Sequence, residues 1–283
     1  MKFFKYILPI FISLTIISCS SDDDESTPVE VNEVEGLIKV QELTNSTHAV
    51  EIFTESGQFE QGYNEITIRV KDLATNVFVD DATMSWIPMM NMVSMSHSCP
   101  NSMLTKVSGM ETIYRGYIVF QMAENADEGW NLMVNYSIAG EDFEAMSDIS
   151  VPASAKQRVT TFMDAEGMRY VVALIAPENP DVMVNDITMG VYKMESMMSF
   201  PVVENYMIKL DPRMPSMGNH TSPNNEDLMY DASSEMYNGK LSLTMTGYWK
   251  LNLMILNEAG DVLKGEEVTE TNESSSLFLE IEF

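Results

Sequence analysis

The chain contains an internal repeat in which His, Tyr, Gly and Met recur at the same spacing and are followed by Trp. In each copy a histidine is followed 17 positions later by Tyr-x-Gly, then by a methionine and a tryptophan. The first copy comprises His97, Tyr114, Gly116, Met122 and Trp130, and the second His220, Tyr237, Gly239, Met245 and Trp249. A repeat of this length predicts two structural units of the same fold, one after the other in the chain. We expect Trp130 and Trp249 to be equivalent buried anchors of the two units.

Methionines gather just before each repeated histidine. The first group is Met89, Met90, Met92 and Met95, which precede His97, and the second is Met214 and Met217, which precede His220. Two of the three histidines in the chain therefore lie beside thioethers at equivalent positions. Thioether and imidazole donors suit a soft cation such as Cu(I). A packed loop without metal is the alternative, because methionine also fills irregular gaps in protein cores.

Apolar and polar residues alternate with a period of two in several short segments. These segments are 64–71, 117–122 and 132–136 in the first half, and 185–192, 241–245 and 251–255 in the second. Such alternation is typical of strands with one buried face. Short strands joined by Gly and Asn turns indicate an immunoglobulin-like sandwich. We expect Gly116 and Gly239 at strand starts, where a turn needs a residue that tolerates positive φ.

The N-terminus resembles the signal of a bacterial lipoprotein. Lys2 and Lys5 precede an apolar run, residues 7–17, that is too short to span a bilayer. The run ends in Ile-Ile-Ser-Cys, which resembles a lipobox and predicts lipidation at Cys19; residues 20–25 resemble the acidic export signal of Bacteroidetes surface lipoproteins. The expected location is the outer membrane, facing the cell exterior, with its periplasmic face as the alternative. A plain secretory signal with a chance cysteine is the other interpretation.

Composition divides the chain into four parts. Residues 1–18 are the predicted signal peptide and 19–35 an acidic disordered tether. Residues 36–150 and 157–283 are the two predicted domains, separated by a short segment rich in small residues and proline. The predicted fold class is all-β, with two tandem immunoglobulin-like β-sandwich domains. Each is long enough to form its own hydrophobic core.

The charge of the chain limits its partners. It carries 43 Asp and Glu against 16 Lys and Arg, a net charge of −27 at pH 7. Nucleic acid and anionic membrane faces would repel such a chain, so we expect no nucleic acid and membrane contact only through the lipid anchor. Solubility alone is a sufficient reason for this charge.

Cys99 is the second of two cysteines. If Cys19 carries lipid, no disulfide can form within one molecule. Cys99 lies two residues after His97, so it is a candidate metal ligand. Burial as a small apolar side chain is the alternative and the commoner fate of a free cysteine.

The segment Met214-Pro-Ser-Met217-Gly-Asn-His220 resembles the Met-Pro-x-Met-Gly-x-His pattern of the YtkA-like family of exported immunoglobulin-like domains. The resemblance is clearest over residues 170–257 and weaker over 45–138. It implies a β-sandwich with a metal-capable loop, marks Met214, Met217 and His220 as ligands, and implies a role around copper. Asn219 and Asn91 stand where a second histidine would strengthen the site, which favours Cu(I) over Cu(II). Neither copy offers the four ligands of a closed zinc site.

Two functions follow from these patterns, and neither is enzymatic. The chain has no Gly-x-Ser-x-Gly elbow, phosphate loop or His-Glu-x-x-His motif. The first hypothesis is a surface lipoprotein that binds Cu(I) for acquisition, sequestration or delivery to a metal acceptor protein. The second is a metal-free interaction module accessory to an outer-membrane transporter. The predicted metal ligands are Met92, Met95, His97, Cys99, Met214, Met217 and His220. The third histidine, His48, is expected on the surface.

Overall fold

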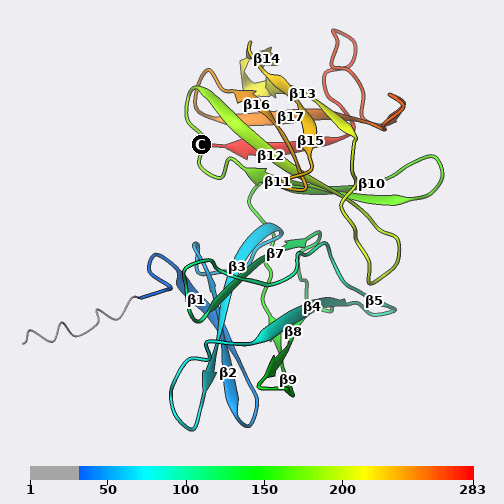
Figure 1. Cartoon of the computed structure of the whole chain (residues 1–283). Coiled ribbons are helices and arrows are strands. Elements are labelled where there is room, and N and C mark those ends of the chain that lie inside the picture. Colours follow the sequence, from blue (N-terminus) through cyan, green and yellow to red (C-terminus); the bar gives the residue numbers. More distant parts are fainter. Residues whose placement is uncertain (1–31) are drawn as a thin grey trace, which may run out of the picture. The chain divides into compact units, whose positions relative to one another are not determined.

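A computed structural model describes residues 32–283 of the chain (Figure 1). Its described residues form strands and one short 3₁₀ turn, so the predicted all-β fold class is confirmed. Cys19, the predicted signal peptide and most of the predicted tether lie outside the described residues. No helix within residues 32–283 is long and apolar enough to cross a membrane.

The first half folds as a sandwich of two antiparallel sheets. One sheet has the order β1-β2-β3-β7-β6, and the other β5-β4-β8-β9. The strands are β1 (Ile38–Thr44), β2 (His48–Thr54), β3 (Gly62–Asp72), β4 (Thr83–Asn91), β5 (Ser96–His97), β6 (Thr105–Lys106), β7 (Ile113–Phe120), β8 (Gly129–Ile138) and β9 (Glu141–Ile149). Buried residues of both sheets share one core, which includes Ile68 of β3 and Trp130 of β8.

The second half repeats this arrangement, with one additional connection between its sheets. Its strands are β10 (Val159–Met163), β11 (Arg169–Ala176), β12 (Val184–Lys193), β13 (Met207–Met214), β14 (His220–Thr221), β15 (Glu226–Asp231), β16 (Met236–Ser242), β17 (Tyr248–Leu256), β18 (Val262–Lys264) and β19 (Phe278–Glu282). Strand β15 pairs with both β16 and β13, so all ten strands form one continuous sheet. Strands β1–β9 do not pair with β10–β19, which supports the tandem organisation.

The register of the strands places the repeated residues at equivalent positions. Trp130 pairs with Ile149 of β9, and Trp249 pairs with Ile281 of β19. The two tryptophans are 2% and 0% exposed, so the prediction of equivalent buried anchors is confirmed. Each indole N–H donates to the carbonyl oxygen of the repeated methionine, Met122 or Met245, at 3.0 Å.

The expectation that Gly116 and Gly239 lie at turns with positive φ was wrong. Both lie inside strands, opposite Ile66 and Ile187 respectively, and neither has a positive φ. The physical reason for glycine is space. A Cβ on Gly116 would lie 2.8 Å from the Trp86 ring, and one on Gly239 would lie 2.6 Å from the Glu226 carbonyl oxygen.

His48 also differs from the expectation. The side chain is buried, not exposed, at the start of β2. Its ring packs edge-on against Tyr136 and Phe143, with ring centroids 5.6 and 4.6 Å away. Its Nδ1 atom lies 2.9 Å from the Thr47 hydroxyl. These contacts assign His48 to the core of the first half, because a ring with an aromatic cage and a local hydroxyl partner needs no other role.

Candidate metal centres

The second candidate centre is the hairpin that joins β13 to β14. Pro215 begins the 3₁₀ turn Pro215–Met217, where its fixed φ suits the first position. Gly218 and Asn219 then reverse the chain with φ values of 68° and 59°. The reversal places His220 directly opposite Met214 in the antiparallel pair β13–β14. The Pro, Gly and Asn of this segment therefore determine which methionine faces the histidine.

The side chains of Met214 and His220 leave the backbone at neighbouring positions on the same face of the hairpin. Directly opposed residues in an antiparallel pair have Cβ atoms about 5 Å apart, so both side chains can reach a common point. Met214 is 2% exposed and belongs to the core, whereas His220 is exposed and Met217 is 57% exposed. The His220 Nε2 atom lies 3.5 Å from the Thr244 hydroxyl, and its ring centroid lies 6.4 Å from that of Trp249. The hairpin thus combines one buried thioether, one exposed thioether and an accessible imidazole.

The first candidate centre is the hairpin that joins β4 to β5. Here Met90 is the residue opposite His97, and Met92 and Met95 lie in the connecting turn, closed by a 2.9 Å hydrogen bond from Met92 N to Met95 O. Met90 is fully buried, Met92 is half-buried and Met95 is exposed. The cross-strand Met–His pair therefore occurs in both halves.

The His97 ring is held more tightly than that of His220. Its Nδ1 atom lies 2.7 Å from the Ser98 carbonyl oxygen. A carbonyl can only accept, so Nδ1 carries the proton and Nε2 is left as the donor to a metal. The Gln121 amide nitrogen also donates to the Ser98 oxygen at 3.2 Å. Gln121 Oε1 is the single buried side-chain polar atom without a hydrogen-bond partner in the described part of the chain.

Cys99 lies in the hydrophobic core of the first half and is 1% exposed. Burial raises the pKa of the Cys99 thiol well above its ordinary value, which disfavours the thiolate that metals bind. The equivalent residue of the second half is Ser222, also buried, whose hydroxyl donates to the Ser242 carbonyl. The placement of Cys99 supports the alternative of a packed thiol.

Met90 is not among the ligands that the sequence predicted for the first centre. Met90 follows Pro88 by two residues, as Met214 follows Pro212. The two prolines occupy the same register, opposite Leu132 and Leu251 respectively. The two connecting turns differ in length by one residue, so the methionine opposite each histidine lies at a different distance before it. The spacing after the proline is the same in both halves and would have identified Met90.

Metal binding at either candidate centre would depend on sulfur donors. Within residues 32–283 no three side chains of His, Cys, Asp or Glu come together in an arrangement that could hold a metal. The donor sets near the two repeated histidines therefore comprise one imidazole and thioethers. Such a set fits Cu(I), and it does not fit Ca²⁺ or Mg²⁺, which require oxygen ligands.

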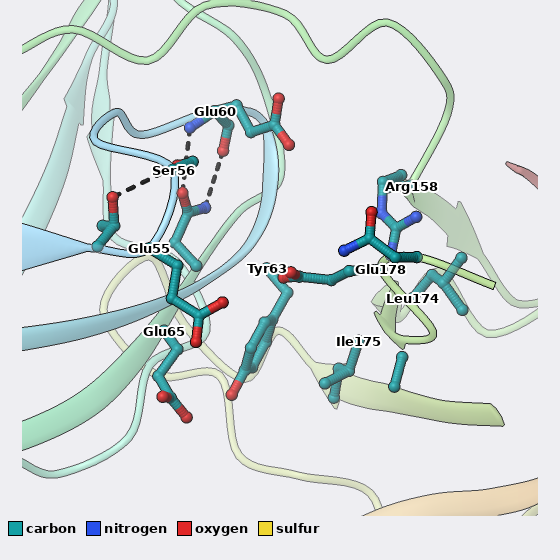
Figure 2. Close-up of a pocket in the computed structure, with 13 residues that line it drawn as sticks. Glu55, Ser56, Glu60, Tyr63, Glu65, Arg158, Leu174, Ile175 and Glu178 are labelled. Atoms are coloured by element: carbon teal, nitrogen blue, oxygen red, sulfur yellow. Dashed lines mark hydrogen bonds between the residues drawn. The ribbon is translucent and has the colours of Figure 1, made fainter. Parts of the chain in front are cut away.

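A separate pocket of about 500 Å³ has a different character (Figure 2). Its lining includes four acidic residues and the half-buried Arg158, and contains no His, Cys or Met. The Arg158 guanidinium donates to the Pro177 carbonyl at 3.1 Å. Burial lowers the pKa of Arg158, and the charges of Glu178 and Glu60 oppose that shift. Because no His, Cys or Met lines this pocket, it lacks the soft donors of the two hairpins.

Comparison with known proteins identifies no family for this chain. No protein-family model matches the chain, and no curated protein matches it. A chimeric titin Z1Z2-Z1Z2 tandem functionalised with a GRGDS peptide from fibronectin has 11% identity, covering 79% of this chain and 93% of that one, with a TM-score of 0.19. An anomalous substructure of Titin-A168169 has 8% identity, covering 73% and 89%, with the same TM-score of 0.19. The fold assignment rests on the strand pairing described above.

Proposed function

We propose that the chain binds Cu(I) through its two Met/His hairpins, as a lipoprotein anchored to the outer membrane through Cys19. Its role would be acquisition, sequestration or delivery of the metal. The observation that supports this most is the cross-strand Met–His pair, which recurs as Met90 with His97 and Met214 with His220. Packing of the core does not by itself require a methionine or a histidine in either hairpin.

The proposed ligands differ in accessibility. In the second centre Met217 and His220 are exposed and Met214 approaches from the core. In the first centre Met95 is exposed, Met92 is half-buried and His97 is buried. Met90 approaches from the core. Cys99 is the weakest member of the proposed set, because its thiol is buried and its thiolate is disfavoured. The resemblance of residues 214–220 to the YtkA-like pattern supports the second centre.

The proposed experiment is an anaerobic competition titration of the full chain, without its predicted signal peptide, against a Cu(I) chelator. We expect about two Cu(I) ions per chain, one per hairpin. The double variant His97→Ala/His220→Ala should lower the affinity by at least about 100-fold, because thioethers alone then remain. Met163→Ala, at an exposed position on β10, is the matched control and should bind like the parent. A double variant that binds as tightly as the parent would contradict the proposal.

A metal-free interaction module is the second candidate function. It is favoured by exposed methionines outside the two hairpins, among them Met103, which is 84% exposed, and Met198, which is 54% exposed. Flexible thioether side chains adapt to different partner surfaces. An outer-membrane transporter is the proposed partner. Absence of Cu(I) binding by the parent, together with co-purification of such a transporter, would favour this function over the first.

A further inference from the structure

We propose that Met245 and Met122, in the turns that follow β16 and β7, each supply a further thioether to the adjacent Cu(I) centre. This inference rests on the proposed function and adds one ligand to each centre.

In the second half the turn 244–247 touches the imidazole and the buried thioether at once. The Thr244 hydroxyl lies 3.5 Å from His220 Nε2. A Cβ on Gly247 would lie 3.4 Å from the Met214 methyl carbon, so the turn passes beside that methyl group. Met245 stands between these two contacts along the chain. Its backbone is therefore close to both residues that the hairpin brings together.

The backbone and side chain of Met245 are both held in place. The Trp249 indole N–H donates to the Met245 carbonyl at 3.0 Å. The Met245 side chain is half-buried and packs against the core cluster that contains Met214. A thioether fixed in this way loses little conformational freedom when it binds a metal, which favours affinity.

Three of these relations recur in the first half with different neighbours. The Gln121 amide nitrogen lies 3.2 Å from Nδ1 of His97, as the Thr244 hydroxyl lies 3.5 Å from Nε2 of His220. The Trp130 indole donates to the Met122 carbonyl at 3.0 Å. Met122 is half-buried and packs against the core cluster that contains Met90. The arrangement is therefore a property of the repeat and not of one loop.

In each half the methionine of the turn joins the imidazole and the hairpin thioethers already proposed. Soft donors of this kind suit Cu(I). Packing is the competing explanation, because methionine fills core gaps. Leucine fills such gaps as well, with a similar volume and no sulfur. Replacing the sulfur while keeping the volume therefore separates the two explanations.

The test uses the full chain with His97→Ala, so that the second centre alone remains. Adding Met245→Leu should lower the Cu(I) affinity at least about 10-fold in competition with a chelator, because one soft donor of the centre is lost. Copper K-edge X-ray absorption should show one sulfur neighbour fewer. Met168→Leu is the matched control, since Met168 is also half-buried against the same core cluster. The reciprocal experiment is Met122→Leu with His220→Ala.

A second measurement needs no variant at Met245. In the His97→Ala chain labelled with ¹³C at the methionine methyl groups, the Met245 resonance should shift together with that of Met214 as Cu(I) is added. An unshifted Met245 resonance, or a Met245→Leu variant that binds like Met168→Leu, would overturn the inference and leave packing as the role of Met245. Failure of the His97→Ala parent to bind Cu(I) would instead contradict the proposed function at this centre.

Discussion

The two Met/His hairpins have the same cross-strand pair and the same neighbouring tryptophan, but they differ in how far the histidine is exposed. His97 is 8% exposed and its Nδ1 is bound to the Ser98 carbonyl, whereas His220 is exposed and only its Nε2 lies near a hydroxyl. One strand pattern can therefore place its histidine in a closed or in an open position.

Segments far away in the sequence contact the two hairpins differently. The Ser98 N–H donates to the Met197 carbonyl at 2.7 Å, so the chain after β12 contacts the first hairpin next to His97. In the second hairpin the corresponding contact is made by Asn219, whose amide donates to the Glu273 carbonyl at 2.9 Å and leaves His220 uncovered. We therefore expect the His220 centre to exchange metal faster than the His97 centre.

The largest expected effect concerns the repeated glycines. Gly239→Ala should lower the free energy of unfolding by about 3 kcal/mol and Gly116→Ala by about 2 kcal/mol, because overpacking strains the surrounding structure. The added methyl at Gly239 meets a backbone oxygen that the sheet fixes, whereas the closest atom at Gly116 belongs to the Trp86 side chain. Urea denaturation measures both values. A greater loss at Gly116 would show that the two positions are not packed as described.

Thiol labelling tests the closed character of the first hairpin. Cys99 should react with iodoacetamide at least about 100-fold more slowly in the folded protein than in urea, because access requires local opening and the thiolate is disfavoured. Ser222→Cys, at the equivalent buried position, should react as slowly, and Met217→Cys, at the exposed tip, should react rapidly. Mass spectrometry follows the three rates in a Cys99→Ala background where needed. Rapid labelling of Cys99 that Cu(I) suppresses would support Cys99 as a ligand instead.

The histidines should also differ in reactivity. Diethylpyrocarbonate should modify His220 roughly 10-fold faster than His97, because a buried ring reacts through local opening. His48 should be as slow as His97, since it is buried as well. Peptide mass spectrometry after short exposures gives the three rates. Equal rates for His97 and His220 would remove the distinction between a closed and an open centre.

The smallest expected effect is at the tip of the second hairpin. Gly218→Ala should cost about 1 kcal/mol of stability, because alanine is strained at a φ of 68° although there is open space around it. Gly218→Asn should cost less, since asparagine tolerates this conformation. Thermal unfolding compares the two variants. A larger loss for Gly218→Asn than for Gly218→Ala would contradict the backbone explanation.

Much of the fold could be predicted from local patterns. The period-two segments 64–71 and 185–192 lie within β3 and β12, because alternation reports the two faces of a strand directly. The burial of His48 could not be predicted in the same way, because other strands make its environment, such as β9, whose Phe143 ring packs against His48.

The sequence by itself determined the repeat, the all-β class and the soft character of the available donors, because these depend on residue types and their spacing. Only the tertiary structure decided which thioether faces each histidine. Register pairs Met90, and not Met92, with His97, and a shift of one residue would have moved the side chain to the other face. The tertiary structure also decided how far the His97 and His220 rings are exposed. The segments that contact the two hairpins are distant along the chain and come close only in the folded protein.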